Sequence, residues 1–235
     1  MSLLTLENVH TYYGEAHILQ GVSVTVGEGE VVTLIGRNGA GKTTTLRSIM
    51  GIVRARRGHV RLRGDDITGL DTHEIARRGI AWIPEERRVL PNLTVLENLR
   101  LGMLGGGKAN GGGVLEEVFG YFPRLRERIA HRGCFLSGGE QQMLAIARGL
   151  VSQPAVMLVD EPTEGLAPLL VQSLTEILAA INRRGTTILL VEQTLEVALA
   201  LSHRVYVMDQ GQIQFEGTPE QLRRDPTIQQ RFLEI

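Results

Sequence analysis

The feature that most constrains this chain is a glycine-rich loop that directly follows an apolar run. The run Val31–Ile35 precedes the loop, whose residues are Gly36, Arg37, Asn38, Gly39, Ala40, Gly41, Lys42, Thr43 and Thr44. The spacing G-x-x-x-x-G-K-T after a buried strand is typical of loops whose backbone N–H groups surround phosphates. In such a loop Lys42 would meet the β- and γ-phosphates, and the Thr43 hydroxyl would ligate Mg²⁺. The alternative, a glycine-rich turn with an incidental lysine, fits this context poorly.

A second apolar run ends in two carboxylates. Val156–Val159 is followed by Asp160 and Glu161. Because adjacent side chains of a strand point in opposite directions, we expect the two acids to have different roles. Asp160 would hold Mg²⁺, directly or through water. Glu161 would orient or deprotonate the attacking water. A solvated acidic strand end is the alternative, and the phosphate loop makes it the weaker interpretation.

The apolar runs also predict the fold class. Val31–Ile35, Val156–Val159 and Thr187–Val191 have apolar side chains on successive residues. This pattern is typical of strands that are covered on both faces, as in a parallel sheet. Residues 168–182 carry apolar side chains at helical spacing and lead into the last of these strands. We therefore expect an α/β core.

Other segments have different patterns. Alternating apolar residues at 22–26 and 60–62 predict half-exposed antiparallel strands near the N-terminus. Residues 204–216 contain an Asp-Gln-Gly turn and predict a hairpin. The stretch from about 92 to 152 has a mostly helical pattern. Within it, the glycine-rich segment 102–113 predicts a flexible surface loop, to which we assign no function.

Composition excludes several classes of protein. Lys and Arg total 25 and Asp and Glu total 26, for a formal net charge of −1, which argues against a protein that coats nucleic acid. The one cysteine, Cys134, excludes an internal disulfide framework and a cysteine-based zinc site. The longest apolar runs fall far short of the roughly 20 residues that a membrane helix needs. We expect a soluble chain whose membrane role, if it has one, comes through a partner.

A third motif, LSGGEQ, begins a predicted helix. Its residues are Leu136, Ser137, Gly138, Gly139, Glu140 and Gln141. Ser137 and Glu140 alone would form an ordinary capping box. Glycine is about 1 kcal/mol worse than alanine inside a helix, so a glycine pair in the first turn indicates that something approaches the backbone closely. The motif thus predicts a second phosphate-binding helix start. If the two anion sites lie far apart, two copies could face each other and share their nucleotides.

The three motifs, in this order, resemble those of the ATP-binding cassette (ABC) ATPases. This resemblance implies a P-loop NTPase (RecA-like) core with an N-terminal antiparallel β subdomain and an inserted helical subdomain. It implies a single domain over residues 1–235, with the core and β subdomain at about 1–91 and 153–235. The helical subdomain, with the LSGGEQ motif, would span about 92–152.

The resemblance also implies a composite ATP site. Two subunits would pack head-to-tail, so that Gly36–Thr44 of one copy and Ser137–Gln141 of the other enclose each ATP. ATP and Mg²⁺ would be the cofactors, and hydrolysis to ADP and phosphate the reaction. Tyr13 lies where the family has an aromatic residue that stacks on adenine, and Tyr12 is the competing candidate. A tyrosine of the core or the surface is the third possibility.

The chain departs from the family pattern at several positions. Glu85 stands where the family usually has glutamine, and a carboxylate is still a suitable oxygen ligand for Mg²⁺. Gln193 replaces the usual switch histidine; it can hydrogen-bond a γ-phosphate but cannot carry a proton charge near neutral pH. Ala167 replaces an aspartate. These departures leave open whether both composite sites are equally active.

The same departures are similar to one type, the LivF-type ATPase of branched-chain amino acid importers. The motifs that carry this similarity are IPEERRV at 83–89, EQQMLAI at 140–146, EGLAP at 164–168 and LVEQ at 190–193. The resemblance implies a second ATPase subunit, two membrane permeases and, indirectly, an extracytoplasmic substrate-binding protein, with no nucleic acid partner. The chain would lie at the cytoplasmic face of the inner (plasma) membrane, with the region 92–136 and the Glu85 loop toward the permease.

Three alternatives remain open at this point. One is an importer ATPase for another solute, such as urea, short amides or other amino acids. Another is a soluble ABC ATPase that acts on nucleic acid or ribosomes. The third is a nucleotide-binding regulator without catalytic activity, which the Asp160–Glu161 pair disfavours.

Overall fold

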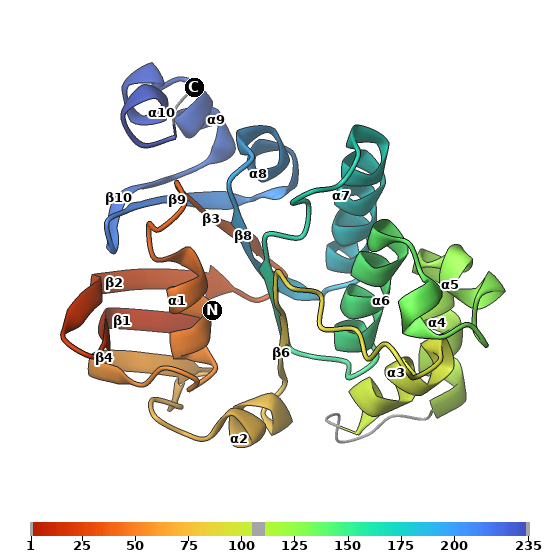
Figure 1. The fold of residues 1–235 in the computed structure, drawn as a ribbon. Helices are drawn as coiled ribbons and strands as arrows, with labels where there is room; N and C mark the ends of the chain where they lie inside the picture. The colour runs from red at the N-terminus through yellow and green to blue at the C-terminus, as the bar shows by residue number, and fades with distance from the viewer. Residues whose placement is uncertain (1, 105–110, 234–235) are drawn as a thin grey trace.

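The central element of the fold is a largely parallel sheet of six strands (Figure 1). The computed structural model describes residues 2–104 and 111–233. In spatial order the strands are β10 (Gln212–Gly217), β9 (Arg204–Asp209), β3 (Val31–Ile35), β8 (Thr187–Glu192), β7 (Val156–Asp160) and β6 (Ile80–Ile83). Only β10 runs antiparallel, to β9. Every residue of β3, β7 and β8 is buried, as their continuous apolar runs predict.

A second, antiparallel sheet lies beside the first. Its strands, in spatial order, are β2 (Ala16–Gly27), β1 (Ser2–Tyr13), β4 (Ala55–Leu62) and β5 (Asp65–Asp66). Helix α1 (Lys42–Ile49) packs between the two sheets, where Leu46 and Ile49 join apolar side chains from both into one core. This packing fixes the start of α1 against the carboxyl end of β3.

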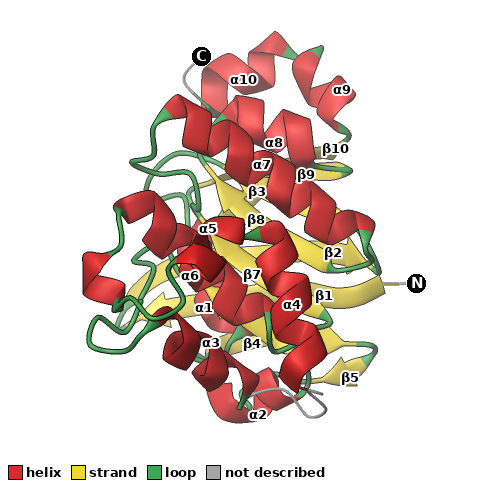
Figure 2. Ribbon diagram, turned by 90° about the vertical axis from the view of Figure 1, so that its right-hand side faces the viewer, coloured by secondary structure: helices red, strands yellow, loops and turns green. Residues whose placement is uncertain are grey.

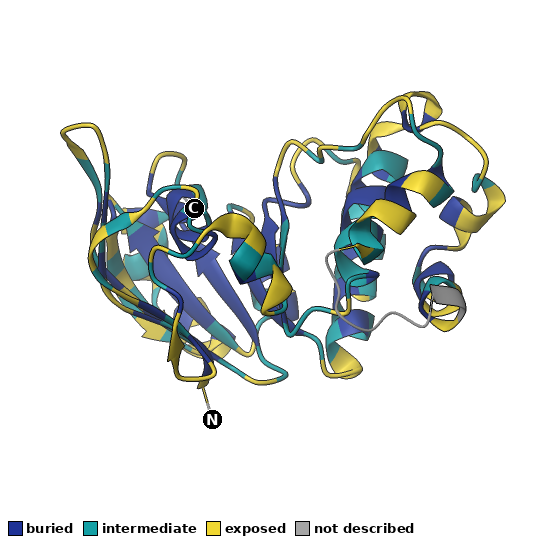
Figure 3. Cartoon of the chain, turned by 90° about the horizontal axis from the view of Figure 1, so that it is seen from below, coloured by how far each residue is buried: buried dark blue, intermediate teal, exposed yellow. Residues whose placement is uncertain are grey.

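The helices fall into groups on the sheets (Figure 2). They are α2 (Thr72–Arg77), α3 (Val95–Met103), α4 (Gly111–Tyr121), α5 (Pro123–Glu127), the 3₁₀ helix η1 (Gly133–Phe135), α6 (Gly138–Leu150), α7 (Pro168–Arg183), α8 (Leu195–Leu201), α9 (Pro219–Arg223) and α10 (Pro226–Phe232). Helices α3 to α7 share a second core with one face of β7 and β8. Helices α8 to α10 share a third core with β9. In Figure 3 the inner strands of the parallel sheet are buried, whereas the strands of the antiparallel sheet also carry intermediate and exposed residues.

The structure confirms the predicted fold class and most predicted elements. The three apolar runs are β3, β7 and β8, and the helix predicted at 168–182 is α7. The hairpin predicted at 204–216 is formed by β9 and β10. The alternating segments 22–26 and 60–62 belong to the antiparallel strands β2 and β4. None of the helices in the described ranges is long and apolar enough to cross a bilayer.

The predicted loop 102–113 is wrong at its edges. Gly102 belongs to α3, and residues 111–113 begin α4. Residues 105–110 lie outside the described residues. The reason is tertiary packing: a Cβ at Gly102 would lie 2.2 Å from the carbonyl oxygen of Arg148 in α6. Glycine is needed there because two helices approach closely, which the composition of the segment does not reveal.

Candidate nucleotide-binding site

The candidate site lies where β3, β7 and β8 end at the same edge of the parallel sheet. Open α/β sheets bind their ligands beyond the carboxyl ends of such strands. A cavity of about 460 Å³ opens here. It is lined by Tyr13, Ile18, Asn38, Gly39, Gly41, Lys42, Thr43, Thr44, Glu85, Glu161, Glu164 and Gln193. The fold thus brings together most of the residues that the sequence predicts for one nucleotide, from segments that are far apart in the chain.

The phosphate loop, residues 36–44, curls around the Lys42 ammonium group. Nζ of Lys42 donates to the carbonyl oxygens of Gly36 (2.7 Å) and Arg37 (3.1 Å). It also pairs with Oε1 of Glu161 at 3.1 Å. Gly36 itself lies tightly against β9, because a Cβ there would be 2.2 Å from the carbonyl oxygen of Met208. The loop is therefore held by contacts within this chain.

The remaining loop residues divide into two sets. Asn38 and Gly39 line the cavity, as does Gly41, whose φ of 109° lies in the region that favours glycine. Gly36, Arg37 and Ala40 do not line it. Ala40 instead accepts a hydrogen bond from the N–H of Gly211 at 2.8 Å, which ties the loop to the β9–β10 turn.

Asp160, the last residue of β7, and Glu161, which follows the strand, both contact the phosphate loop. Oδ1 of Asp160 accepts a hydrogen bond from Oγ1 of Thr43 at 3.1 Å. Strand β7 ends at Asp160, and Glu161 has a φ of 43°, in the left-handed region. The alternation expected of a strand therefore does not extend to Glu161, whose carboxylate pairs with Lys42. The two acids still contact different groups, as their predicted roles require.

The oxygens around Asp160 fit a divalent cation. Oδ2 of Asp160 is buried and has no hydrogen-bond partner, although Oδ1 of the same carboxylate does. Burial raises the pKa of Asp160 to about 6, and the charge of Glu161 also raises it, against the hydrogen bond from Thr43. A hard cation such as Mg²⁺ prefers carboxylate and hydroxyl oxygens with phosphates and waters. The described residues contain no cluster of three or more His, Cys, Asp or Glu that would hold a metal. A cation here would therefore need oxygens from its ligand and from water.

Glu85 faces this region beside a residue that the sequence analysis missed. Partial desolvation, a hydrogen bond with Glu164 and the charges of Glu164 and Glu161 raise the pKa of Glu85. Glu164 lines the same cavity. The sequence does place Glu164 three residues after Glu161, which could have indicated a role at the site. Its contact with Glu85, however, depends on how the loop after β7 folds.

Gln193 and the two tyrosines are also located by the structure. The side-chain amide of Gln193 donates to Oε2 of Glu161. Tyr13 lines the cavity with 41% of its surface exposed, and its hydroxyl accepts a hydrogen bond from Arg47. Tyr12 does not line the cavity; its ring stacks on His17 at 4.1 Å. Tyr13 is therefore the tyrosine that is available to a ligand at this site.

The LSGGEQ helix start does not line the same cavity. Ser137 and Glu140 form the predicted capping box, with the N–H of Ser137 donating to Glu140 at 2.8 Å. A Cβ at Gly138 or Gly139 would meet the side-chain ends of Arg87 or Leu170, each at 2.7 Å. Gln141 donates its side-chain amide to the carbonyl oxygen of Gly133. One chain thus holds two separate candidate anion sites.

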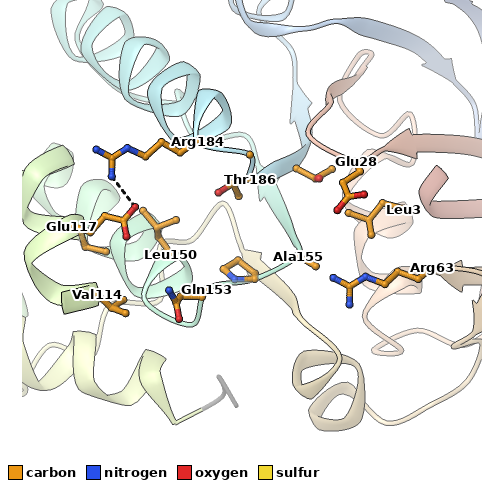
Figure 4. A pocket seen from close by; sticks show the side chains of 14 residues that line it. Leu3, Glu28, Arg63, Val114, Glu117, Leu150, Gln153, Ala155, Arg184 and Thr186 are labelled. Carbon is orange, nitrogen blue, oxygen red and sulfur yellow. Dashed lines mark hydrogen bonds and ion pairs between the residues drawn. The ribbon is translucent and has the colours of Figure 1, made fainter. Parts of the chain in front are cut away.

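A further cavity lies at the other edge of the parallel sheet (Figure 4). It has a volume of about 290 Å³ and includes Ala155 and Thr187, which lie at the amino ends of β7 and β8. Arg184 pairs with Glu117 across part of its wall at 3.0 Å. None of the residues predicted for the nucleotide lines this cavity.

Fold and site together define a nucleotide-binding ATPase with a phosphate loop. The chain belongs to the ABC transporter family, whose model matches residues 19–164. It is 44% identical to the high-affinity branched-chain amino acid transport ATP-binding protein BraG of Pseudomonas aeruginosa, over 98% of this chain and 99% of that protein. It is 35% identical to the lipopolysaccharide export system ATP-binding protein LptB of Haemophilus influenzae, over 99% of this chain and 98% of that protein.

Solved structures agree with this assignment. MJ1267, an ATP-binding cassette of an ABC transporter, matches with a TM-score of 0.86 and 31% identity, over 98% of each chain. The dimeric MJ0796 cassette in a post-hydrolysis state bound to ADP and Pi matches with a TM-score of 0.81 and 28% identity, over 92% of this chain and 98% of that chain. The predicted family, fold class and ATPase activity are confirmed: the chain is the ATP-hydrolysing subunit of an ABC transporter.

Proposed function

We propose that this ATPase subunit drives the uptake of branched-chain amino acids through membrane permease partners. The observation that carries the proposal is the 44% identity to BraG over nearly the full length of both chains. The LptB proteins of lipopolysaccharide export match over a similar length at lower identity, 35% for that of Haemophilus influenzae. Lipopolysaccharide export is therefore the second candidate, and import of urea, short amides or other amino acids is the third.

We propose that the phosphate loop binds the triphosphate and that Glu161 directs hydrolysis. Asn38, Gly39 and Gly41 would surround the phosphates with backbone N–H groups. Lys42 would stabilise negative charge on the β- and γ-phosphates. Lys42 already pairs with Glu161, which supports a location of that carboxylate close to the γ-phosphate. Glu161 would hold the attacking water and accept its proton, and Gln193 would fix the Glu161 carboxylate from the other side.

Thr43, Asp160 and Glu85 are the proposed residues for Mg²⁺. The hydrogen bond between Thr43 and Asp160, the unpartnered Oδ2 of Asp160 and the exposed Glu85 carboxyl support this assignment. Bound Mg²⁺ would neutralise charge on the β- and γ-phosphates. Thr43 and Asp160 would hold their oxygens toward the phosphates, and Glu85 would contribute from the loop after β6.

We propose that the ATP site is completed by a neighbouring cassette. Ser137, Gly138, Gly139 and Gln141 would contact the phosphates bound by the phosphate loop of a second ATPase subunit, identical or related. Support comes from the separation of the LSGGEQ helix start from this chain's own cavity. Tyr13 would stack on adenine at the open side of the cavity, where its ring is exposed. ATP would then favour the closed dimer, and hydrolysis would release it.

A groove beside the site is the proposed contact for the permease. It has a volume of about 440 Å³ and is lined by residues of β6, α2, α3 and α6, including Trp82 and Leu101. Pro84 lines this groove, and the next residue, Glu85, lines the nucleotide cavity. A permease segment in the groove would therefore adjoin the loop that faces ATP. These contacts would hold the chain at the cytoplasmic face of the membrane, and the permeases would receive solute from an extracytoplasmic binding protein.

The test is reconstitution of the chain with its permeases in vesicles. We expect a leucine-loaded binding protein to stimulate ATP hydrolysis and leucine uptake together. Stimulation by urea or short amides, or transfer of lipopolysaccharide, without a response to leucine would contradict the proposed solute. Phosphate release by the isolated chain serves as the control, because it tests the ATPase independently of the solute.

A further inference from the structure

Glu192 is a buried acid that the proposed mechanism does not use. It is the last residue of β8, and only 2% of its surface is exposed. Oε1 accepts a hydrogen bond from Oγ1 of Thr163 at 2.8 Å. Oε2 accepts from the backbone N–H groups of Gln193 (3.1 Å) and Thr194 (3.5 Å). No lysine, arginine or histidine within residues 2–104 or 111–233 forms a salt bridge with it.

Three groups donate hydrogen bonds to Glu192, and together they reach both of its carboxylate oxygens. All three are hydrogen-bond donors, and an ionised carboxylate accepts without donating. A leucine in its place would accept none of these bonds, whereas a glutamine could keep them by donating its NH₂ group to the Thr163 hydroxyl oxygen. Burial raises the pKa of Glu192, while the bonds from Thr163, Gln193 and Thr194 oppose that shift. Burying a carboxylate that has no cationic partner is unfavourable. The hydrogen bonds that Glu192 accepts are therefore the place to look for its role.

The hydrogen bonds of Glu192 join two loops that carry hydrolytic residues. Thr163 lies in the loop after β7, two positions beyond Glu161. Gln193 begins the loop after β8 and donates its side-chain amide to Glu161. The backbone N–H of Glu161 also donates to the carbonyl oxygen of Val191 at 2.9 Å. Together these contacts fix the two loops as one unit.

We propose that Glu192 is a positioning residue for hydrolysis, which acts by holding the Thr163 loop against the Gln193 loop. Glu161 and Gln193 then keep the relative position that the attacking water requires. This inference rests on the proposed roles of Glu161 and Gln193. It assigns Glu192 and Thr163 to the chemical step and not to nucleotide binding, since neither lines the nucleotide cavity.

The test compares Thr163→Val, which keeps the shape but removes the hydroxyl, with Thr163→Ser, which keeps the hydroxyl. We expect Thr163→Val to lower kcat at least about tenfold, because small misplacements of catalytic groups have effects of this size, and to leave KM for ATP within about twofold. Thr163→Ser should keep more than about half of kcat, because the bond to Glu192 remains. Thr175→Val is the matched control: the Thr175 hydroxyl donates only within α7, to Val171.

Glu192→Leu provides an independent variant in case Thr163→Val does not fold, because leucine accepts none of the three hydrogen bonds. It should show the same fall in kcat with an unchanged KM, and Glu192→Leu with Thr163→Val should be no slower than either alone. Unchanged kcat in both single variants, or a rise in KM equal to the fall in kcat, would overturn the proposal. A Glu161→Gln variant with normal turnover would instead refute the role of Glu161, so the two failures are distinguishable.

Discussion

The phosphate loop and the LSGGEQ helix start both present glycines and backbone N–H groups, but the chain holds them differently. A Cβ at Gly36 would lie 2.2 Å from a backbone oxygen of β9, and Lys42 is held by two carbonyl oxygens and Glu161. Gly138 is approached only by the end of the flexible Arg87 side chain. Packing within the chain thus requires a glycine at position 36 but not at position 138. This difference supports the proposal that Gly138 serves a group from outside the chain.

The largest expected effect concerns the nucleotide cavity that holds Lys42 and Glu161. We expect Glu161→Gln to lower kcat by about 10²- to 10⁴-fold, because it removes the proton acceptor while keeping a similar shape. ATP binding should persist, since the Lys42 loop is intact. Phosphate release and nucleotide binding are the two measurements. Glu176→Gln is the control, because Glu176 lies on α7 outside the nucleotide cavity; normal steady-state hydrolysis by Glu161→Gln would contradict the assignment.

A pair of alanine variants tests the comparison itself. Gly36→Ala should lower the free energy of unfolding by about 1–3 kcal/mol, because the new methyl group collides with the backbone of β9. Gly138→Ala should change it by less than about 1 kcal/mol, because Arg87 can move and alanine is the better helix former. Hydrolysis should fall in both variants. Denaturant titration measures the loss of stability in each variant, and phosphate release measures the loss of hydrolysis. Equal losses of stability in the two variants would refute the difference between the two glycines.

Gln193 provides a smaller test at the same site. We expect Gln193→Ala to lower kcat by roughly tenfold, the size expected when one hydrogen bond to a charged group is lost. That loss is smaller than the loss for Glu161→Gln, because Gln193 only holds the Glu161 carboxylate. Steady-state kinetics of Gln193→Ala and Glu161→Gln compares the two losses of kcat. An equal loss would show that Gln193 is itself essential.

The smallest expected effect separates the two tyrosines. Tyr13→Ala should raise KM for ATP by about five- to tenfold, because a stacking contact of roughly 1 kcal/mol or more is lost. Tyr12→Ala should leave KM within about twofold, since its ring stacks on His17 and does not line the cavity. Hydrolysis measured over a range of ATP concentrations compares them. A larger effect of Tyr12→Ala would mean that the wrong tyrosine has been assigned.

The sequence was sufficient for the local features of this molecule. Continuous apolar runs predicted β3, β7 and β8, and the glycine–lysine spacing predicted the loop before α1. It could not predict contacts that depend on how distant segments fold together. Glu164 meets Glu85 only through the loop after β7, and Glu192 meets Thr163 across 29 positions of the chain. Likewise, the sequence does not predict that β7 ends at Asp160 or that Glu161 has a left-handed φ of 43°.

The most direct test of the account is the structure of Glu161→Gln trapped with ATP and Mg²⁺. We predict that each ATP lies between residues 36–44 of one cassette and the LSGGEQ helix start of its neighbour. Ser137 of the neighbour should then lie within hydrogen-bond distance of the γ-phosphate. A nucleotide-loaded form in which that helix start contacts no phosphate would contradict the account.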